Sequence, residues 1–535
     1  MLFESLEEIR EQWQVMRQAF APLRLTRWQL TKLCAAQIFR DYPAIATLLV
    51  LLVAVLLLWL VNVLIRPKRL EKVIGLPVLG ASKILKNDLL SVIEEGKRKY
   101  PDTPYIVNAS GLQYVVYPAI FFDEIKRLSE KEASAQDFFH TVTYGRWTNI
   151  GAETDALWKT IAVDLARSVP VKVPSKQKDA RIAFDKFVGY CPEEKKVNIF
   201  GTMMKVVATT NACSFVGREV GTGEWAEAVQ QLPISVFLAV MTLSWIPRVL
   251  RPLLQPIVLL PALYVQRKMR LILEPIIRSD IEEYEKAADR KSTLKTTEDG
   301  KLPFTQWLLA RYKSGEATPY QLATDHILTS FESTVSTAVT LYNIILDLAV
   351  RPELQDELRQ EVEEVMFDGR LPSTNLKELR KMDSVMRETF RVNPFALFSL
   401  YRITRKPVQL SSGPRLPAGT IICVDSHHIH TSPELFPSPE AFDPYRFLKK
   451  REEPGAEHRY QFVSTGPVDP TWGDGTQACP GRFFANSTLK VCLAHVLMNY
   501  NVKLQEGQER PKVVGMPNGT WAPDMSAEIL FQSRD

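Results

Sequence analysis

A stretch of 22 residues without a charge, 44–65 (AIATLLVLLVAVLLLWLVNVLI), limits what this 535-residue chain can fold into more than any other feature. At a rise of about 1.5 Å per residue, a helix of this length spans the roughly 30 Å hydrocarbon core of a bilayer. A cleavable signal is a poorer interpretation, because the stretch is longer than a typical signal and begins only after 43 residues. The sequence therefore predicts a single transmembrane helix over 44–65.

The flanks of this stretch predict its orientation. Basic residues are more frequent after it than in a similar window before it: Arg66, Lys68, Arg69 and Lys72 against Lys32 and Arg40. This excess places the C-terminal part in the cytosol and the N-terminus in the lumen. In 1–43, apolar residues recur at spacings of three and four. That pattern predicts an amphipathic helix on the bilayer surface, with a partner-binding helix as the alternative.

Charge and cysteine usage exclude other classes of protein. The net charge of +5 comes from 66 basic and 61 acidic residues, a surplus too small to indicate nucleic-acid binding. The six cysteines form no Cys-x-x-Cys pair, which suits a reducing compartment. We expect the Asn-x-Ser/Thr triplets at Asn108, Asn486 and Asn518 to be unused.

Beyond residue 65 the sequence predicts a mainly α fold with a minor β region. Helical periodicity marks 321–348, 352–366 and 376–392, whereas 397–424 contains β-branched runs divided by Ser-Ser-Gly-Pro and Pro-Ala-Gly. The apolar segment 232–247 has only sixteen residues and a proline near each end. We therefore expect a helix pair that dips into the bilayer surface, not a second span.

The stretch Trp472-Gly-Asp-Gly-Thr-Gln-Ala-Cys479-Pro-Gly-Arg-Phe-Phe-Ala suits a cysteine that binds a metal through its sulfur. Gly475 and Gly481 are expected to allow positive φ and a close approach to a planar cofactor. A helix that starts nearby would direct its positive end at the sulfur and lower the thiol pKa. The alternative is a small buried cysteine with no ligand role.

This stretch resembles the haem-binding loop of the cytochrome P450 superfamily, Phe-x-x-Gly-x-Arg-x-Cys-x-Gly, and especially that of fungal biosynthetic members. Trp472 stands where the family has Phe, and Gln477 stands where it has Arg. The resemblance covers about 66–535 and implies one catalytic domain there, with 1–43 as the amphipathic segment and 44–65 as the anchor. It implies that Cys479 is the axial ligand to the iron of haem b, next to Gly475 and Gly481.

Further motifs follow the family's order. The resemblance implies a structural triad of Glu388, Arg391 and Arg446, although a surface ion pair with a loop arginine is the alternative. It also implies that Arg402 binds a haem propionate. For the other propionate the family has Trp-x-x-x-Arg; here Trp158 is followed by Ala162, so Lys159 is the substitute that we consider.

The helix that activates oxygen in the family carries an acid followed by an alcohol. Counting back from Pro352, the family spacing falls on Ser336 and Thr337, with Val335 at the position of the acid. Residue types instead favour Glu332 and Ser333. We prefer the spacing, and leave the other register open. A separate cluster, His427-His428-x-His430, is interpreted as a strand-to-loop segment without a ligand role.

The resemblance implies a haem-thiolate monooxygenase that takes electrons from NADPH through NADPH-cytochrome P450 reductase, with cytochrome b5 as a further donor. It also implies an endoplasmic reticulum protein, single-pass, with its catalytic domain in the cytosol. A lipophilic small molecule entering from membrane lipid is the expected substrate, a terpenoid or related fungal natural product of secondary metabolism. Nucleic acid is not expected. An isomerase or dehydratase without external oxygen and a non-catalytic haem or lipid binder are the alternatives.

Overall fold

The computed structural model describes residues 47, 52, 53, 56, 70–80, 89–246, 250–290, 304–313, 315–372, 374–516 and 518–534. The amphipathic segment expected over 1–43 lies outside these residues, as does the helix expected over 44–65, apart from four isolated positions. Two units make up the chain: Met1–Arg69 with Pro247–Pro252, and Leu70–Ile246 with Leu253–Asp535. Almost all described residues belong to the second unit.

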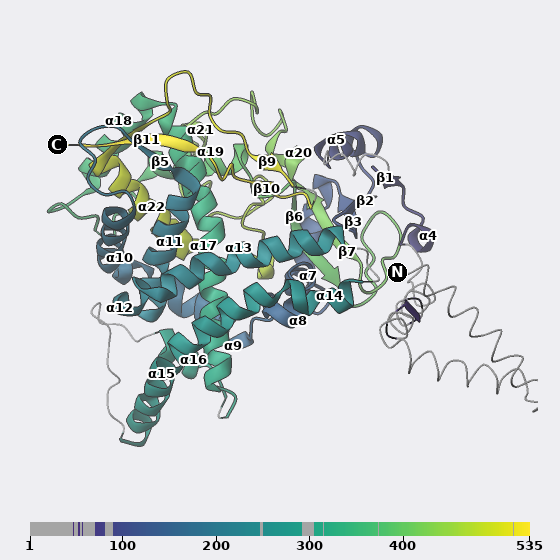
Figure 1. Cartoon of the computed structure of the whole chain (residues 1–535). Helices are drawn as coiled ribbons and strands as arrows, with labels where there is room; N and C mark the ends of the chain where they lie inside the picture. The colour runs from purple at the N-terminus through teal and green to yellow at the C-terminus, as the bar shows by residue number, and fades with distance from the viewer. Residues whose placement is uncertain are drawn as a thin grey trace, which may run out of the picture. The chain divides into compact units, whose positions relative to one another are not determined.

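Helices dominate the second unit (Figure 1). Its central helices are α10 (Ala166–Phe187), α11 (Ile199–Val216), α17 (Pro319–Ala349), α18 (Pro352–Val365), α19 (Arg380–Val392) and α22 (Arg482–Asn499). The remaining longer helices are α5 (Leu89–Lys99), α7 (Ala135–Val142), α13 (Glu224–Trp245), α14 (Arg251–Val258) and α15 (Leu260–Arg290). Shorter helices are α4 (Leu70–Ile74), α6 (Phe122–Arg127), α8 (Gly145–Thr148), α9 (Asp155–Lys159), α12 (Arg218–Gly221), α16 (Phe304–Leu309), α20 (Ser426–His430) and α21 (Arg446–Glu452).

The start of α17 follows from local chemistry. Thr318 accepts a hydrogen bond from the N–H of Gln321 at 3.2 Å, and Pro319 occupies the first turn, where its missing N–H costs nothing. α18 likewise begins at a proline, Pro352. The helices predicted over 321–348 and 352–366 are thus confirmed. α19 begins four residues later than predicted, at Arg380.

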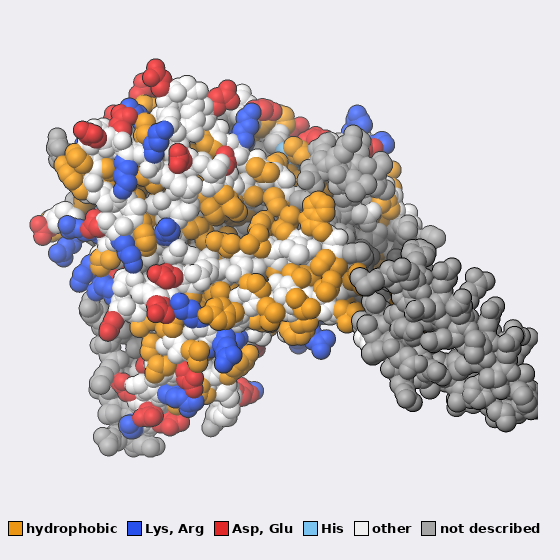
Figure 2. All heavy atoms as spheres, in the orientation of Figure 1, with side chains coloured by type: hydrophobic (Ala, Val, Ile, Leu, Met, Phe, Trp, Pro, Cys, Tyr) orange, Lys and Arg blue, Asp and Glu red, His pale blue; other side chains and the backbone are white. Residues whose placement is uncertain are grey.

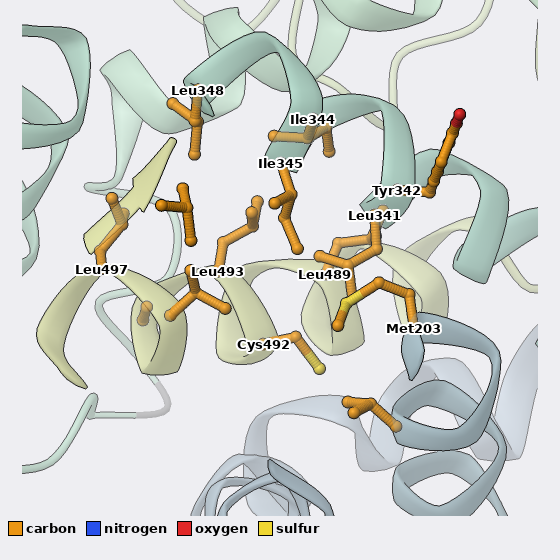
Figure 3. Close-up of a cluster of buried hydrophobic side chains, with 14 of the residues drawn as sticks. Met203, Leu341, Tyr342, Ile344, Ile345, Leu348, Leu489, Cys492, Leu493 and Leu497 are labelled. Carbon is orange, nitrogen blue, oxygen red and sulfur yellow. The ribbon is translucent and has the colours of Figure 1, made fainter. Parts of the chain in front are cut away.

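α17 and α22 pack through large aliphatic side chains (Figure 3). Figure 3 shows residues of both helices pointing toward one another: Leu341, Ile345 and Leu348 from α17, and Leu489, Leu493 and Leu497 from α22. All six belong to one buried core cluster. This packing fixes α22 against the rest of the core, and the loop that carries Cys479 leads directly into this helix.

A six-stranded sheet lies beside the helices, in the order β1-β2-β3-β7-β6-β4 (Figure 1). Its strands are β1 (Val78–Leu79), β2 (Tyr105–Ala109), β3 (Leu112–Tyr117), β4 (Ala133–Ser134), β6 (Phe398–Thr404) and β7 (Ile421–Asp425). The strands predicted within 397–424 correspond to β6 and β7, which pair antiparallel. The sheet is larger than expected, because β3 pairs parallel to β7, with Tyr114 opposite Ile421.

Two smaller sheets complete the β structure of the described residues. β5 (Lys195–Asn198), β11 (Glu528–Ser533) and β8 (Tyr500–Lys503) form one sheet in that order. β9 (Val514–Gly515) and β10 (Trp521–Ala522) form a two-stranded sheet. Since β11 pairs with β5, the last strand of the chain is joined to the segment that precedes α11.

The expected helix pair over 232–247 is wrong, because these residues up to Trp245 form the second half of one helix, α13, which contains Pro233. Among the described helices, α11 and α13 are long and apolar enough to cross a membrane, as are α17 and α18 if counted as one span bent by 115°. The most apolar window is 61% buried inside the protein for α11 and 44% buried for α13. α11 is therefore a core helix, while α13 presents an apolar face outward.

Candidate haem-thiolate active site

The loop before α22 closes on itself around Cys479. The backbone N–H of Cys479 donates to the carbonyl of Trp472 at 2.8 Å, and the indole N–H of Trp472 donates to the carbonyl of Phe462 at 2.6 Å. The Trp472 ring packs against Phe390 and Phe462, with centroids 5.2 and 5.4 Å apart. Tryptophan in place of phenylalanine thus keeps the apolar contact and adds a hydrogen bond.

Gln477 ties the cysteine loop to the segment before α7. Its Nε2 donates to the carbonyls of Leu128 at 3.2 Å and Ala133 at 3.0 Å, and its Oε1 accepts from the N–H of Ala135 at 2.8 Å. The amide is therefore engaged with backbone on both sides. A residue used in this way holds the loop in place and leaves anion binding to other groups.

The two glycines of the loop differ in conformation. Gly475 has φ +69°, and an added Cβ would lie 2.7 Å from the carbonyl oxygen of Lys126. Only glycine fits there. The expected positive φ is wrong for Gly481, whose φ is −85°. An added Cβ at Gly481 would meet no protein atom within 4 Å among the described residues, so open space lies beside the cysteine.

The sulfur of Cys479 faces the start of α22. The backbone N–H groups of Gly481 and Arg482 hydrogen-bond to the thiol, as expected for an anionic ligand at a helix N-terminus. Burial nevertheless raises the pKa of Cys479 to about 11, because loss of water outweighs these bonds. The expectation that the loop alone lowers the thiol pKa is therefore wrong. A thiolate here requires a metal ion, which deprotonates its ligand on binding.

α17 directs an acid toward the same region. Burial raises the pKa of the Glu332 carboxyl far above its usual value. The pKa is raised further by a hydrogen bond with the carboxyl of Glu153, and Glu332 in turn raises the pKa of Cys479. The two carboxyls therefore lie next to each other. Sequence reasoning missed Glu153, which lies between α8 and α9.

The hydroxyls of α17 lie close to this acid. Both serine hydroxyls bond back to the preceding turn: Ser336 donates to the backbone carbonyl of Glu332 and Ser333 to that of Ser330, each at 3.3 Å. Val335, at the position of the family acid, packs against the main core cluster, and Thr337 is buried. Because Glu332 and Ser336 are four residues apart, they share one face of the helix.

The structure brings Glu388, Arg391 and Arg446 together in the interior. Arg391 donates to both carboxylate oxygens of Glu388 at 2.8 and 2.9 Å, and Nε of Arg446 lies 3.1 Å from each of them. Arg391 also donates to the carbonyls of His430 and Pro439. All three charged groups are at least nine-tenths buried, so this is not a surface ion pair. The cluster joins α19 to the segment that leads into α21.

Arg402 on β6 is buried, and Nη1 donates to the carbonyl of Tyr401 at 2.8 Å. Its Nε and Nη2 have no hydrogen-bond partner among the described residues. Burial lowers the pKa of Arg402 to about 10, so the group is charged at neutral pH. A buried cation with two free donors requires an anion, and a haem propionate fits.

Lys159 does not lie among the buried residues of the candidate site. Trp158 is half-buried near the end of α9, whereas Lys159 is exposed, and a π-helical turn, η4 (Thr160–Leu165), follows at once. The protein groups that fit haem are therefore the Cys479 sulfur, the open space at Gly481 and the free donors of Arg402. Together they supply an axial ligand for the iron, space for the porphyrin ring and a positive charge to pair with a propionate.

The fold and this site define a class. The cytochrome P450 family model matches residues 248–530, and the chain belongs to this family. It is a haem-thiolate monooxygenase of the kind that fungi use in secondary-metabolite biosynthesis.

Particular relatives match over nearly their full length. The chain is 80% identical to cytochrome P450 monooxygenase ffsD of Aspergillus flavipes, over 99% of this chain and 100% of that protein. It is 64% identical to cytochrome P450 monooxygenase phmB of Phaeosphaeria nodorum, over 99% and 89%. It is 42% identical to pyrichalasin C-18 hydroxylase of Pyricularia grisea, over all of both chains.

A solved structure supports the fold alone. Retinoic acid bound cyanobacterial CYP120A1 superimposes with a TM-score of 0.62 at 15% sequence identity, covering 86% of this chain and 99% of that one. The mainly helical fold with a minor β region is thus the P450 fold.

Proposed function

We propose that this monooxygenase hydroxylates an unactivated carbon of a lipophilic fungal natural product, with Cys479 as the iron ligand and Arg402 as a propionate partner. The observation that carries the proposal is the thiol held under two backbone N–H groups beside open space. Haem bound there supplies oxygen activation, and a thiolate ligand favours cleavage of the O–O bond. The electrons come from NADPH through NADPH-cytochrome P450 reductase, with cytochrome b5 as a second donor.

The protein's own residues position the cofactor and supply protons. Gly481 and Arg482 hold the sulfur by their N–H groups, and Arg402 neutralises an acidic edge of the ring system. Glu332, which lies next to Glu153, is the acid that would supply a proton, and the hydroxyls of Ser336 and Thr337 on the same helix would hold water beside it. The presence of an acid on α17 favours a reaction that consumes protons over the isomerase or dehydratase alternative.

The enzyme is anchored in the endoplasmic reticulum membrane by residues 44–65, with the catalytic domain, 66–535, in the cytosol. Support comes from a set of exposed apolar side chains on α13, α14 and α15, which we call the apolar patch: Ile234, Leu238, Trp245, Leu253, Ile257, Leu260 and Tyr264. Hydrophobic atoms gather over these helices in Figure 2. Exposed apolar area of this kind favours contact with lipid, and lipid is where a lipophilic substrate accumulates.

The substrate class follows from chemistry and from one relative. Pyrichalasin C-18 hydroxylase, by its name, hydroxylates C-18 of pyrichalasin, and we propose the same type of C–H hydroxylation for this chain. A terpenoid substrate stays a prediction. Microsomes from a host that expresses the protein, supplied with NADPH and with terpenoid or pyrichalasin-type precursors, would identify the product by mass spectrometry.

The test of the central assignment is Cys479→Ala. The reduced carbon monoxide complex of the wild type is expected to show the red-shifted Soret band of a thiolate-ligated haem, and the variant is expected to lack it. Cys191→Ala, which alters a buried thiol elsewhere, is the matched control and should keep the band. A band that survives in Cys479→Ala would overturn the proposal.

A further inference from the structure

A second cluster of ligating side chains lies where α5 meets α20. Glu94 of α5 faces His427 and His428 of α20, and the three residues offer ligand atoms within 4.8 Å of one another. His427 Nε2 lies 2.9 Å from Glu94 Oε1, and His428 Nε2 lies 3.4 Å from Glu94 Oε2. His430 is not part of this cluster, because its Nε2 faces Asp469 at 3.7 Å.

Asp425 fixes the proton of His428. Its carboxylate is hydrogen-bonded to His428 Nδ1, and it also accepts from the backbone N–H of His428 at 3.1 Å as the N-cap of α20. Because a carboxylate only accepts, Nδ1 carries the proton, and in the neutral ring the lone pair sits on Nε2. Asp425 therefore aims a lone pair at the carboxylate of Glu94.

The Nε2 atom of His428 is the observation that points to a ligand. Its side chain is only 9% exposed, and the one group that Nε2 faces among the described residues is the Glu94 carboxylate at 3.4 Å, too poorly placed for a regular hydrogen bond. When the ring is neutral with its proton on Nδ1, two electron-rich atoms, this nitrogen and Glu94 Oε2, face each other across 3.4 Å. A cation between them removes that repulsion.

We propose that Glu94, His427 and His428 bind a divalent transition-metal ion of the zinc type, with Asp425 orienting His428. Two imidazoles and one carboxylate form a donor set that Zn²⁺ accepts, with a fourth position left for water. A carboxylate on the far nitrogen of a ligating histidine is the usual support for such a ligand. His427 joins the set once its proton moves to Nδ1, which changes the tautomer but not the charge.

The location gives the ion a structural role. α5 carries Glu94, whereas α20 directly follows β7, a strand of the six-stranded sheet. A bound ion would join these elements and raise the stability of the folded protein by mass action. Glu94 is 54% exposed, so the ion reaches the site from solvent.

The experiment is a titration of the tag-free, haem-loaded, chelator-treated protein with ZnCl2, followed by calorimetry. We expect one saturable event with one ion per chain. Glu94→Gln should weaken it at least about tenfold, since it removes a ligand, and Asp425→Asn should weaken it about tenfold while keeping the helix cap, because asparagine also caps. Addition of Co²⁺ should give the absorption of a cobalt–histidine complex.

The matched control is Glu95→Gln, on the neighbouring position of α5, where the carboxylate pairs with Lys99. It should bind zinc like the wild type, and all variants should keep the carbon monoxide spectrum as evidence of an intact fold. Equal affinities for Glu94→Gln and Glu95→Gln would overturn the proposal. So would the lack of a one-to-one event, which would mean that a proton on His428 Nε2 takes the place of the metal.

Discussion

The hydroxyl of Ser336 donates to the backbone carbonyl of Glu332, one turn earlier on α17, at 3.3 Å. The sequence offers two registers for the oxygen-activating motif, one on Ser336 and one on Glu332. In the helix the two positions lie on one face, one turn apart. Ser336, the alcohol predicted from the family spacing, and Glu332, the acid predicted from residue type, therefore lie at the same region of the site.

Replacement of Ser336 by Ala should uncouple the enzyme. The change leaves Cys479 and Arg402 untouched, so the haem spectrum and substrate binding should be unchanged, while more peroxide is released per NADPH consumed. Glu332→Gln should do the same, because an amide cannot supply the proton that a carboxyl can. Ser333→Ala is the comparison, because Ser333 is the alcohol of the other register and its hydroxyl, like that of Ser336, donates to a backbone carbonyl of the preceding turn. If only Ser333→Ala raised peroxide release, the preferred register would be wrong by one helical turn.

Breaking the triad should destabilise the fold without changing the chemistry. Glu388→Gln leaves Arg391 and Arg446 buried without a counter-charge, and such a loss costs about 3–5 kcal/mol. The free energy of unfolding should fall by that amount, measured from urea transitions of the haem-loaded protein. Glu274→Gln breaks the exposed pair with Arg278 and should cost at most about 1 kcal/mol. Similar costs for both variants would contradict a structural role for the triad.

Removal of the Arg402 charge should weaken haem retention. A charge-assisted hydrogen bond contributes about 1.5–3 kcal/mol, so Arg402→Leu should speed haem transfer to apomyoglobin by roughly tenfold to a hundredfold. Arg402→Lys should recover part of the loss, because it keeps the charge. The control is Arg405→Gln, whose exposed guanidinium pairs with Asp137 and Glu130. An unchanged transfer rate in Arg402→Leu would remove this residue from the proposed site.

The sequence predicted the elements whose pattern lies within the element itself, and it missed contacts between segments far apart in the chain. α17 and α18 were placed within two residues of their ends, because the helical periodicity that predicts them lies within each helix itself. The pairing of β3 with β7 was missed, because it joins Tyr114 to Ile421 and no local pattern records such a partner. α13 was read as two helices, because Pro233 suggests a break that tertiary packing overrides.

The sequence predicted the residues of the candidate site that belong to a motif. It did not predict those that only tertiary packing brings to the site. Cys479, Glu388 and Arg391 lie in patterns of fixed spacing. Glu153 lies in a loop, and only the fold places its carboxyl against Glu332. The thiol pKa was also misjudged, since a pattern of glycines conveys the hydrogen bonds to sulfur but not the burial that outweighs them.

Deletion of 1–65 should move much of the protein into the soluble fraction with its carbon monoxide spectrum intact, because Cys479 and Arg402 belong to the second unit. Some membrane association should persist through the apolar patch, since each large apolar side chain moved out of water contributes about 1.5–3 kcal/mol. In the truncated protein, Trp245→Ser with Leu260→Ser should lower binding to lipid vesicles at least about tenfold. Phe367→Ser, which alters an equally exposed aromatic outside the patch, should leave it unchanged. Loss of haem on truncation would instead mean that the N-terminal residues belong to the catalytic fold.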